Sequence, residues 1–250
     1  MSKNQKKIWI TGASSGIGKA VAEKFAKEGW KVAVSARRKE LLDELAKNEN
    51  ISSFPLDVTD RSQINNTFKS ILNEFGDLDI CLFSSGTYEP KDEQSIDPDK
   101  IKNVINVNFL GVIDCVKVVE DYFKKKKTGH ISIVSSIASY RGLPNSSGYG
   151  PSKAALTNFS ESIYFDFKKF GVRVSVVSPG FIKTPLTDKN EFPMPFLKTP
   201  EYAADKIYDG LVEGNAFEIH FPKGLTLTLK FLRILLYRLY LFLVDKLVKR

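Results

Sequence analysis

The sequence predicts an α/β fold, a single Rossmann-like doubly wound parallel sheet of about seven strands with helices on both faces. Short apolar runs alternate with stretches of helical periodicity along most of the 250 residues, a pattern typical of repeated β-α units. The first apolar run is followed at once by a glycine-rich turn, as in the first unit of a dinucleotide-binding sheet. An amphipathic helical tail is expected to follow the sheet.

The strands are expected where apolar residues run almost without interruption, because a strand covered on both faces needs no polar alternation. The helices are expected where apolar residues recur on one side, as in the stretch from Arg61 to Phe75. The expected strands are 8–10, 32–35, 53–56, 78–83, 131–134, 172–177 and 217–221. The expected helices run from the glycine-rich turn to Gly29 and over 41–47, 61–75, 101–123, 154–170 and 201–212.

Composition and length favour one catalytic domain. A hydrophobic content of 42% can bury a substantial core. We assign residues 1–224 to one dinucleotide-binding and catalytic domain, with a proline-rich substrate lid at about 181–200, and residues 225–250 to the tail. The net charge is +8, and the tail holds six basic residues against one acid, so the positive charge is not a nucleic-acid footprint spread over a domain.

The few cysteines and histidines exclude several chemistries. Two cysteines in apolar runs favour packing roles over a disulfide, and two histidines far apart argue against a metal site or a histidine triad. The polar N-terminus shows no signal or transit peptide, which favours a cytoplasmic protein.

The first strand leads into the pattern Thr11-Gly12-x-x-x-Gly16-Ile17-Gly18. Glycines let the backbone approach a pyrophosphate, and the N-terminus of the following helix offers amide donors and a partial positive charge. The alternative is an ordinary tight strand-to-helix turn. The cofactor-binding candidates of this segment are Thr11, Gly12, Ser14, Ser15, Gly16, Ile17 and Gly18.

The second strand ends in Arg37 and Arg38. An acidic residue at this place in a dinucleotide fold binds the 2′-hydroxyl of NAD, whereas arginine accommodates the 2′-phosphate of NADP. The pair therefore predicts NADP(H) as cofactor, against the alternative of a solvated basic pair that starts a helix. Further candidates follow other strands and should share the same rim of the sheet: Asp57, Ser84 to Gly86, Ser136 and Pro179-Gly180.

Tyr149 and Lys153 form the candidate catalytic pair. Residues four apart on a helix share a face, so an ammonium lies beside a phenol. The chain holds four Tyr-x-x-x-Lys pairs, but only Tyr149 has a serine thirteen residues upstream, Ser136, and follows a strand and loop. This context selects Tyr149 as the candidate acid/base.

Together these motifs resemble the short-chain dehydrogenase/reductase family over roughly residues 6–221. The glycine pattern is similar to the family's cofactor loop, and Asp57-Val58 to its adenine-facing aspartate segment. Asn108, Ser136, Tyr149 and Lys153 match the catalytic tetrad. Pro179-Gly180, with Ile182 and Thr184, resembles the segment that lies over the nicotinamide. One departure is Phe83-Ser84-Ser85-Gly86, which stands where relatives usually have Asn-Asn-Ala-Gly; Ser85 and Gly86 remain cofactor candidates.

The resemblance implies hydride transfer between nicotinamide and a carbonyl carbon. Tyr149 would be the general acid, with a pKa moved toward neutrality by Lys153 and the nicotinamide charge. Ser136 would hold the carbonyl oxygen, and Asn108 would position Lys153 through a water. It also implies a homodimer or homotetramer assembled through the two long helices. The alternatives are a 3-oxoacyl thioester reductase and a non-catalytic NADP(H)-sensing protein, although such proteins typically lack the tyrosine or lysine.

The tail is rich in apolar and basic residues, yet its longest stretch without a charge is only Leu239 to Val244. About twenty apolar residues are needed to span a bilayer, so it is not expected to span one. A basic amphipathic helix suits contact with a membrane surface, and the alternatives are packing on a partner subunit or roofing the substrate pocket. With the lid residues Phe192, Pro193, Met194 and Phe196, the tail favours an apolar, lipid-like carbonyl substrate.

Overall fold

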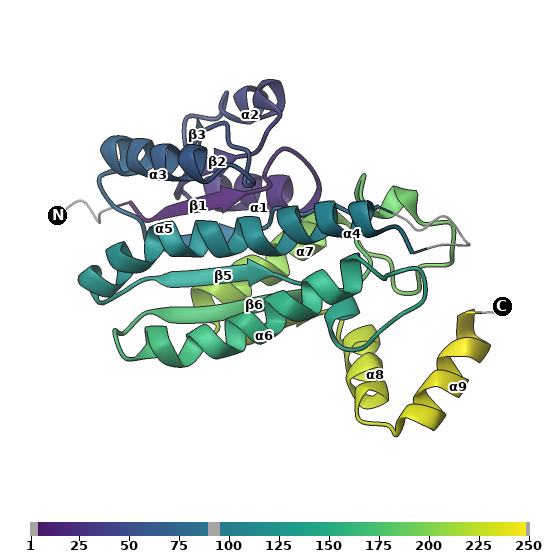
Figure 1. Ribbon diagram of the computed structural model, residues 1–250. Helices are drawn as coiled ribbons and strands as arrows, with labels where there is room; N and C mark the ends of the chain where they lie inside the picture. The colour runs from purple at the N-terminus through teal and green to yellow at the C-terminus, as the bar shows by residue number, and fades with distance from the viewer. Residues whose placement is uncertain (1–4, 90–95, 249–250) are drawn as a thin grey trace.

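The computed structural model describes residues 5–89 and 96–248, and its centre is one parallel sheet with strand order β3-β2-β1-β4-β5-β6-β7 (Figure 1). The strands are β1 Lys7–Thr11, β2 Lys31–Ser35, β3 Ile51–Ser53, β4 Ile80–Phe83, β5 His130–Val134, β6 Arg173–Pro179 and β7 Glu218–Phe221. The chain winds outward from β1 in one direction through β2 and β3, and in the other from β4 to β7. This reversal leaves a crevice beyond the carboxyl ends of β1 and β4, where ligands of such sheets bind. The predicted fold class is confirmed.

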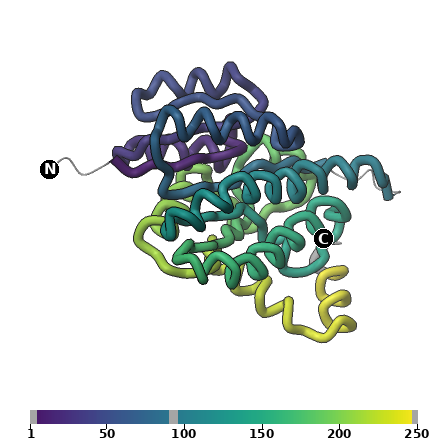
Figure 2. The backbone as a smooth tube through the Cα atoms, turned by 60° about the vertical axis from the view of Figure 1, so that its left-hand side comes forward, coloured from purple at the N-terminus to yellow at the C-terminus, as the bar shows by residue number. Residues whose placement is uncertain are grey.

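The helices cover both faces of the sheet, with α3, α5 and α6 on one face and α1 and α7 on the other. The α-helices are α1 Gly16–Lys27, α2 Lys39–Leu45, α3 Arg61–Phe75, α4 Pro98–Ile105, α5 Gly111–Lys126, α6 Tyr149–Lys168, α7 Pro200–Tyr208, α8 Lys223–Arg233 and α9 Tyr237–Val248. In the tube view, the tail, drawn in yellow, extends from one side of the molecule (Figure 2).

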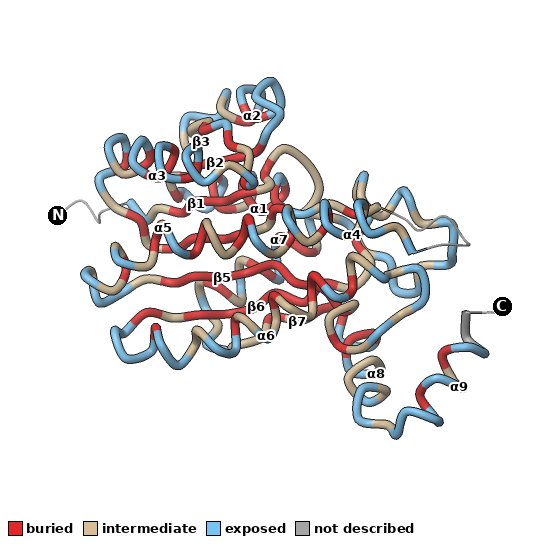
Figure 3. Tube along the Cα trace, viewed as in Figure 1, coloured by how far each residue is buried: buried red, intermediate tan, exposed pale blue. Residues whose placement is uncertain are grey.

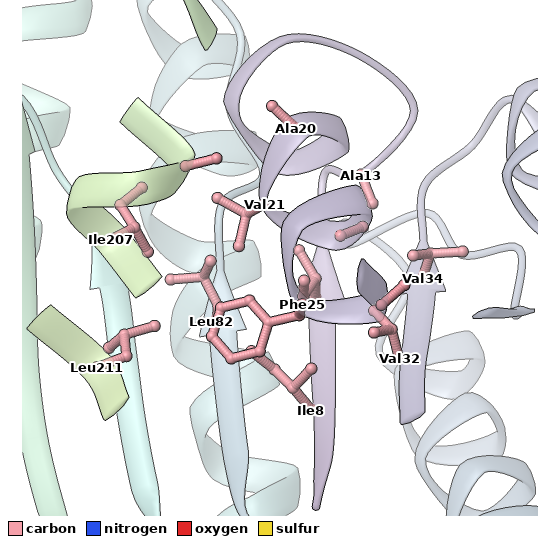
Figure 4. Packing of buried hydrophobic residues seen from close by; sticks show 14 of the residues in the cluster. Ile8, Ala13, Ala20, Val21, Phe25, Val32, Val34, Leu82, Ile207 and Leu211 are labelled. Atoms are coloured by element: carbon pink, nitrogen blue, oxygen red, sulfur yellow. The ribbon is translucent and has the colours of Figure 1, made fainter. Parts of the chain in front are cut away.

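Each face of the sheet carries its own core. On one face, Phe25 of α1 packs onto Ile8 and Leu82, with Ile207 of α7 beside them (Figure 4). On the other face, Trp9 and Phe123 belong to the core built from α3, α5 and α6. Side chains on both faces of the central strands are buried, which is why these strands read as continuous apolar runs (Figure 3).

The predicted single helix 101–123 is present as one continuous helical run over 98–126, but its winding changes within the run. α4 and α5 are joined by a π-helical turn over Asn106–Leu110. A Cβ atom on Gly111, directly after the turn, would lie 2.7 Å from the carbonyl oxygen of Val58. The extra residue of a π-helical turn changes the helical phase there, and such turns are frequent at functional sites.

Two other boundaries differ from the prediction. β3 spans Ile51–Ser53 rather than 53–56, although the amides of Phe54 and Leu56 still donate to the carbonyl oxygens of Val34 and Ala36 at 2.9 and 3.0 Å. The tail is two helices rather than one: α8 begins at Lys223, and the chain turns at Ile234 before α9 begins at Tyr237. Continuous apolar composition across this turn concealed it in the sequence.

Candidate functional site

A cavity of about 470 Å³ lies at the carboxyl ends of the strands, where the sheet predicts a ligand site. All predicted cofactor residues except Thr11 line it: Gly12, Ser14, Ser15, Gly16, Ile17, Gly18, Arg37, Arg38, Asp57, Val58, Ser85, Gly86, Tyr149, Lys153, Pro179, Gly180, Ile182 and Thr184. Ser136 lines it as well, whereas Asn108 does not. The rim predicted from the strand ends is therefore one continuous surface.

The glycine-rich turn packs backbone against backbone. Gly12 has φ +70°, and a Cβ atom there would lie 2.7 Å from the carbonyl oxygen of Ser84. A Cβ atom on Gly18 would lie 2.4 Å from the carbonyl oxygen of Gly12. Ser15 makes no side-chain cap on α1, so the first amides of that helix have no side-chain acceptor. This arrangement fits the phosphates of a dinucleotide.

Thr11 supports the cavity from behind. Its side-chain oxygen accepts hydrogen bonds from the amides of Ser84 (3.2 Å) and Ser85 (3.4 Å). These bonds join the end of β1 to the end of β4. The departure from Asn-Asn-Ala-Gly thus retains a tie between the two strands, made by backbone donors.

Arg38 reaches across the mouth of the cavity to the glycine-rich turn. Its guanidinium donates to the hydroxyl oxygen of Ser14 at 2.8 and 3.2 Å and to that of Ser15 at 2.9 Å. Arg37 lines the same part of the cavity. Two guanidinium groups beside two hydroxyls form a cationic pocket suited to a phosphate.

Ser136, Tyr149 and Lys153 meet at the inner end of the cavity. Ser136 follows β5, while Tyr149 and Lys153 lie in the first turns of α6. The Lys153 ammonium donates to the carbonyl oxygen of Val134 at 2.8 Å and lies 5.6 Å from the centre of the Tyr149 ring. The predicted serine, tyrosine and lysine therefore stand together.

Burial dominates the electrostatics of this pair. Desolvation raises the pKa of Tyr149 to about 12, and hydrogen bonding with Ser136 acts in the opposite direction. Desolvation also lowers the pKa of Lys153 to about 8. The expected lowering of the Tyr149 pKa is therefore not produced by the protein's own groups, because the cost of burying a tyrosinate outweighs their effect.

Asn108 lies in the π-helical turn and is completely buried. Its amide oxygen accepts from the backbone N–H of Thr87 at 2.7 Å, and its amide nitrogen donates to the Thr87 carbonyl and to the Ser152 hydroxyl, each at 3.0 Å. The Ser152 hydroxyl in turn donates to the Tyr149 carbonyl at 2.7 Å. Asn108 thus joins the chain after β4 to the first turn of α6, and it makes no direct hydrogen bond to Lys153.

A second cavity, of about 660 Å³, adjoins the first. The two share Ser136, Tyr149, Gly180, Leu186 and Thr187. Most of the other lining side chains are apolar and come from the loop before α6, the lid and α8: Leu143, Pro144, Phe181, Phe192, Pro193, Met194, Pro195, Leu225, Leu229 and Leu232. Tyr149 therefore stands at the boundary between a polar and an apolar cavity.

Tyr88 is a site residue that the sequence reasoning missed. It is buried, lines the second cavity, and packs edge-on against Tyr149, with ring centres 5.5 Å apart. Its backbone carbonyl accepts from the Lys189 ammonium at 2.9 Å, which connects the chain after β4 to the lid. Its position could have marked Tyr88 as a site residue, because it is an aromatic residue two positions after Gly86, which lies on the predicted rim.

Residues 181–200, the predicted lid, border the second cavity, but Phe196 does not face it. Phe192, Pro193 and Met194 line the second cavity, whereas Phe196 does not line it and is 58% exposed. The lid is irregular apart from a short turn at Thr187–Lys189, and Ile182 pairs with Lys198 across its base.

Within residues 5–89 and 96–248, no group of three or more histidine, cysteine, aspartate or glutamate residues is placed to hold a metal ion. The same part of the chain contains no helix that is both long and apolar enough to cross a membrane. Cys81 and Cys115 are buried free thiols.

Comparisons with known proteins agree with this geometry. The family model described as short chain dehydrogenase matches residues 6–193. An uncharacterised oxidoreductase of Myxococcus xanthus is 32% identical over 90% of this chain and 91% of its own length. A 3-oxoacyl-[acyl-carrier-protein] reductase, FabG, of Thermotoga maritima is 34% identical over 72% of this chain and 75% of its own length.

Two solved structures show the likeness in three dimensions. ElxO with NADP bound is 31% identical, with a TM-score of 0.78 over 86% of this chain and 97% of that chain. A short-chain dehydrogenase from Streptomyces avermitilis has a TM-score of 0.85 over 99% of this chain and 98% of that chain, and at 24% identity it supports the fold alone. On the match of the family model and of these relatives, the chain belongs to the short-chain dehydrogenase family.

Proposed function

We propose that this protein is an NADP(H)-dependent oxidoreductase that transfers a hydride between nicotinamide and a carbonyl compound or secondary alcohol, with Tyr149 as general acid/base. The observation that carries this proposal is the position of Tyr149, which lines both cavities beside Ser136. The polar cavity suits the cofactor and the apolar cavity suits the substrate. Hydride donor and carbonyl would then meet at the phenol.

Three features support NADP(H) as the cofactor. The glycine-rich turn and the N-terminus of α1 fit a pyrophosphate. Arg37 and Arg38 line the place where the 2′-phosphate of NADP would bind. ElxO, 31% identical to this chain, has been solved with NADP bound, and a tyrosine-to-phenylalanine variant of it with NADPH bound.

The bound cofactor supplies or accepts the hydride, and the protein handles the proton. Ser136 would donate a hydrogen bond to the carbonyl oxygen. With its pKa raised to about 12, the Tyr149 phenol is protonated at neutral pH and is ready to give its proton to the forming alkoxide. The Lys153 ammonium stabilises the tyrosinate left behind. Asn108 and Ser152 hold the backbone at Tyr149 in place.

The second cavity indicates the substrate class. Its walls away from Ser136 and Tyr149 are mainly aliphatic and aromatic side chains. Such walls stabilise apolar groups and leave few partners for charged ones. We therefore infer an apolar, lipid-like carbonyl compound.

The alternative is a 3-oxoacyl thioester reductase, favoured by the 34% identity to FabG of Thermotoga maritima. Activity on acetoacetyl thioesters would support it. A non-catalytic NADP(H)-sensing role is a weaker candidate, since Ser136, Tyr149 and Lys153 stand together in the cavity. NADPH oxidation with any member of a carbonyl panel would exclude that role.

The substitution Tyr149→Phe tests the proposal. It removes the transferable proton and keeps the ring, so carbonyl-dependent NADPH oxidation should fall by about 10²- to 10⁴-fold. The dissociation constant for NADPH, measured by calorimetry, should change little.

Tyr164→Phe is the matched control. Tyr164 lies in the same helix with the same spacing to Lys168, and its ring packs on Phe217. This variant should retain wild-type turnover. Substantial residual activity in the Tyr149 variant would overturn the assignment.

The proposal extends to assembly and location. Phe165 and Phe170, at and just beyond the end of α6, are 65% and 40% exposed, which supports a homodimer or homotetramer that uses this helix.

The exposed apolar side chains of α8 and α9 lie among basic ones, which supports contact of a cytoplasmic protein with an anionic membrane surface.

A further inference from the structure

Arg141 lies in the loop between Ser136 and Tyr149, and its side chain binds the junction of α8 and α9. The guanidinium donates to the carbonyl oxygens of Leu232 (3.2 Å), Arg233 (3.1 Å) and Leu235 (2.7 Å). Leu232 and Arg233 belong to the C-terminal turn of α8, where a helix leaves acceptors unpaired and carries partial negative charge, and Leu235 lies in the turn that follows. Arg141 therefore caps a helix that lies about ninety residues later in the chain.

The same side chain holds the start of α9. Its guanidinium carbon lies 4.4 Å from the ring centre of Tyr237 and 4.1 Å from that of Tyr240, within the range of cation–π attraction. The Tyr240 hydroxyl donates to the Gly142 carbonyl at 2.6 Å. Tyr240 is only 3% exposed, although most of the surrounding helix faces solvent.

The residue before Arg141 makes a further attachment. The Tyr140 hydroxyl donates to the Glu218 carboxylate at 2.6 Å, and the Lys230 ammonium of α8 donates to the other oxygen of that carboxylate. Residues 140–142, here called the tail clasp, thus hold α8 and α9 through side chains and one backbone carbonyl.

The clasp is continuous with the wall of the apolar cavity. Directly after it, Leu143 and Pro144 line this cavity together with Leu225, Leu229 and Leu232 of α8. The loop then reaches Ser146, whose side-chain oxygen accepts from the Gly150 amide at 3.0 Å in the first turn of α6. One short segment therefore holds the tail, forms part of the cavity wall and leads to Tyr149.

We propose that Arg141 is a positioning residue that determines substrate length. By fixing α8 against the loop before Tyr149, it sets the wall of the apolar cavity contributed by the tail, and long apolar substrates gain binding energy from that wall. The proposal rests on the proposed function of this cavity. Arg141 does not line either cavity, so it takes no part in proton transfer. A short ketone, held at Ser136 and Tyr149, does not need the wall formed by α8.

The test compares Arg141→Met and Arg141→Lys with the wild type, using methyl ketones that carry ethyl, hexyl or decyl chains. In Arg141→Met, KM for the decyl ketone should rise about tenfold, a loss of about 1.4 kcal/mol of binding. KM for the ethyl ketone, kcat, the pH profile of kcat and NADPH affinity should stay close to wild type. Arg141→Lys should recover only part of the difference, because an ammonium can replace the one nitrogen, Nη1, that donates to the three carbonyls but lacks the planar group that lies over the two rings.

Arg238→Met is the matched control, because Arg238 is an exposed arginine of α9 that lines neither cavity. Hydrogen–deuterium exchange gives a readout independent of any substrate. The backbone amides of residues 225–246 should exchange faster than in the wild type in Arg141→Met. Their exchange rates should be unchanged in Arg238→Met. Tyr240→Phe removes only the hydrogen bond to Gly142. It should raise KM for the decyl ketone and the exchange rate of the tail amides, each by less than Arg141→Met does. This variant replaces Arg141→Met in the test if Arg141→Met does not fold.

The outcomes separate the two proposals. Equal KM changes for all three ketones, or unchanged exchange in the tail of Arg141→Met, would overturn the role of Arg141. If none of the carbonyl compounds tested supported NADPH oxidation by the wild-type protein, the proposed function would fail. In that case the exchange measurement would still decide whether Arg141 fixes the tail.

Discussion

At the scale of single residues, burial gives Tyr149 and Lys153 pKa changes of opposite sign. The phenol resists ionisation and the ammonium loses its proton more easily, each because its charged form is desolvated. Burying the charged Lys153 therefore destabilises the folded state, and the residue is kept for its proposed role beside Tyr149. This cost can be measured as a pH-dependent stability.

Lys153→Met should stabilise the ligand-free protein. The pKa of Lys153 is about 8 when folded and about 10.4 in an unfolded chain. Below pH 8 the lysine is charged in both states, so the full desolvation cost is present; between about pH 8 and 10 the folded state releases its proton first and the cost falls. The free energy of unfolding of the variant, measured in urea at pH 7, should be about 1 to 3 kcal/mol higher than that of the wild type. The advantage should shrink as the pH rises to 10.

Lys168→Met, an exposed change on the same helix, should alter stability little at either pH. A Lys153 variant less stable than wild type at pH 7 would mean that the bond to the Val134 carbonyl outweighs desolvation.

The sequence predicted the residues that have a spacing rule and missed those defined by contacts alone. Ser136, Tyr149 and Lys153 follow from helix periodicity and strand ends. Tyr88, Ser152 and Arg141 act through partners distant in the chain, such as the Tyr149 ring, the Asn108 amide and the end of α8. No local pattern reports such partners.

At the scale of elements, the π-helical turn between α4 and α5 positions Asn108. Asn106, Asn108 and Gly111 interrupt an apolar stretch of the sequence, but periodicity cannot show where a helix gains a residue per turn. Strand and helix order were predictable, since each follows from apolar pattern. The end of β3 and the break between α8 and α9 were not, because the extended chain continues beyond β3 and the apolar composition continues across the break.

Gly111→Ala should destabilise the protein and weaken catalysis together. The added Cβ atom would meet the Val58 carbonyl at 2.7 Å, and a backbone atom has little room to move. We expect a loss of about 1 to 3 kcal/mol in unfolding free energy, with a lower kcat because the turn that holds Asn108 must shift. Gly142→Ala is the control, because a Cβ atom there meets no other atom within 4 Å. Equal stability of the two variants would contradict this account.

At the scale of the whole molecule, the tail has two different environments. The inner face of α8 lines the apolar cavity, as one of the alternatives for the tail anticipated. Outside, large apolar side chains remain exposed on both tail helices and on the turn between them: Leu227, Phe231, Ile234, Leu236, Tyr237, Leu239, Leu241 and Phe242. Exposed Arg233, Arg238 and Lys246 accompany them. Apolar and basic groups side by side suit an anionic lipid surface.

The protein should co-sediment with vesicles that contain phosphatidylserine and much less with phosphatidylcholine alone. Added salt should weaken binding because it screens the basic groups. The double variant Ile234→Ser, Leu236→Ser changes side chains that are 77% and 83% exposed, so it should fold normally and partition into vesicles about tenfold less. Leu41→Ser, an exposed change on α2, should bind as wild type.

Unchanged co-sedimentation of the double variant would contradict lipid contact by this surface. A smaller particle size in light scattering, without a change in vesicle binding, would instead assign the surface to a second copy of the chain.

The placement of the chain ends has a practical consequence for attaching labels. β1 begins at the amino ends of the strands, opposite the carboxyl ends where both cavities lie, whereas α9 lies on the side of the carboxyl ends. A fusion or surface tether at the N-terminal end would leave the cavity mouths and the tail clear. The same attachment at the C-terminal end would pull on α9, the helix that Arg141 holds. Substrate binding measured on a protein immobilised in that way would then depend on the tether as well as on the substrate.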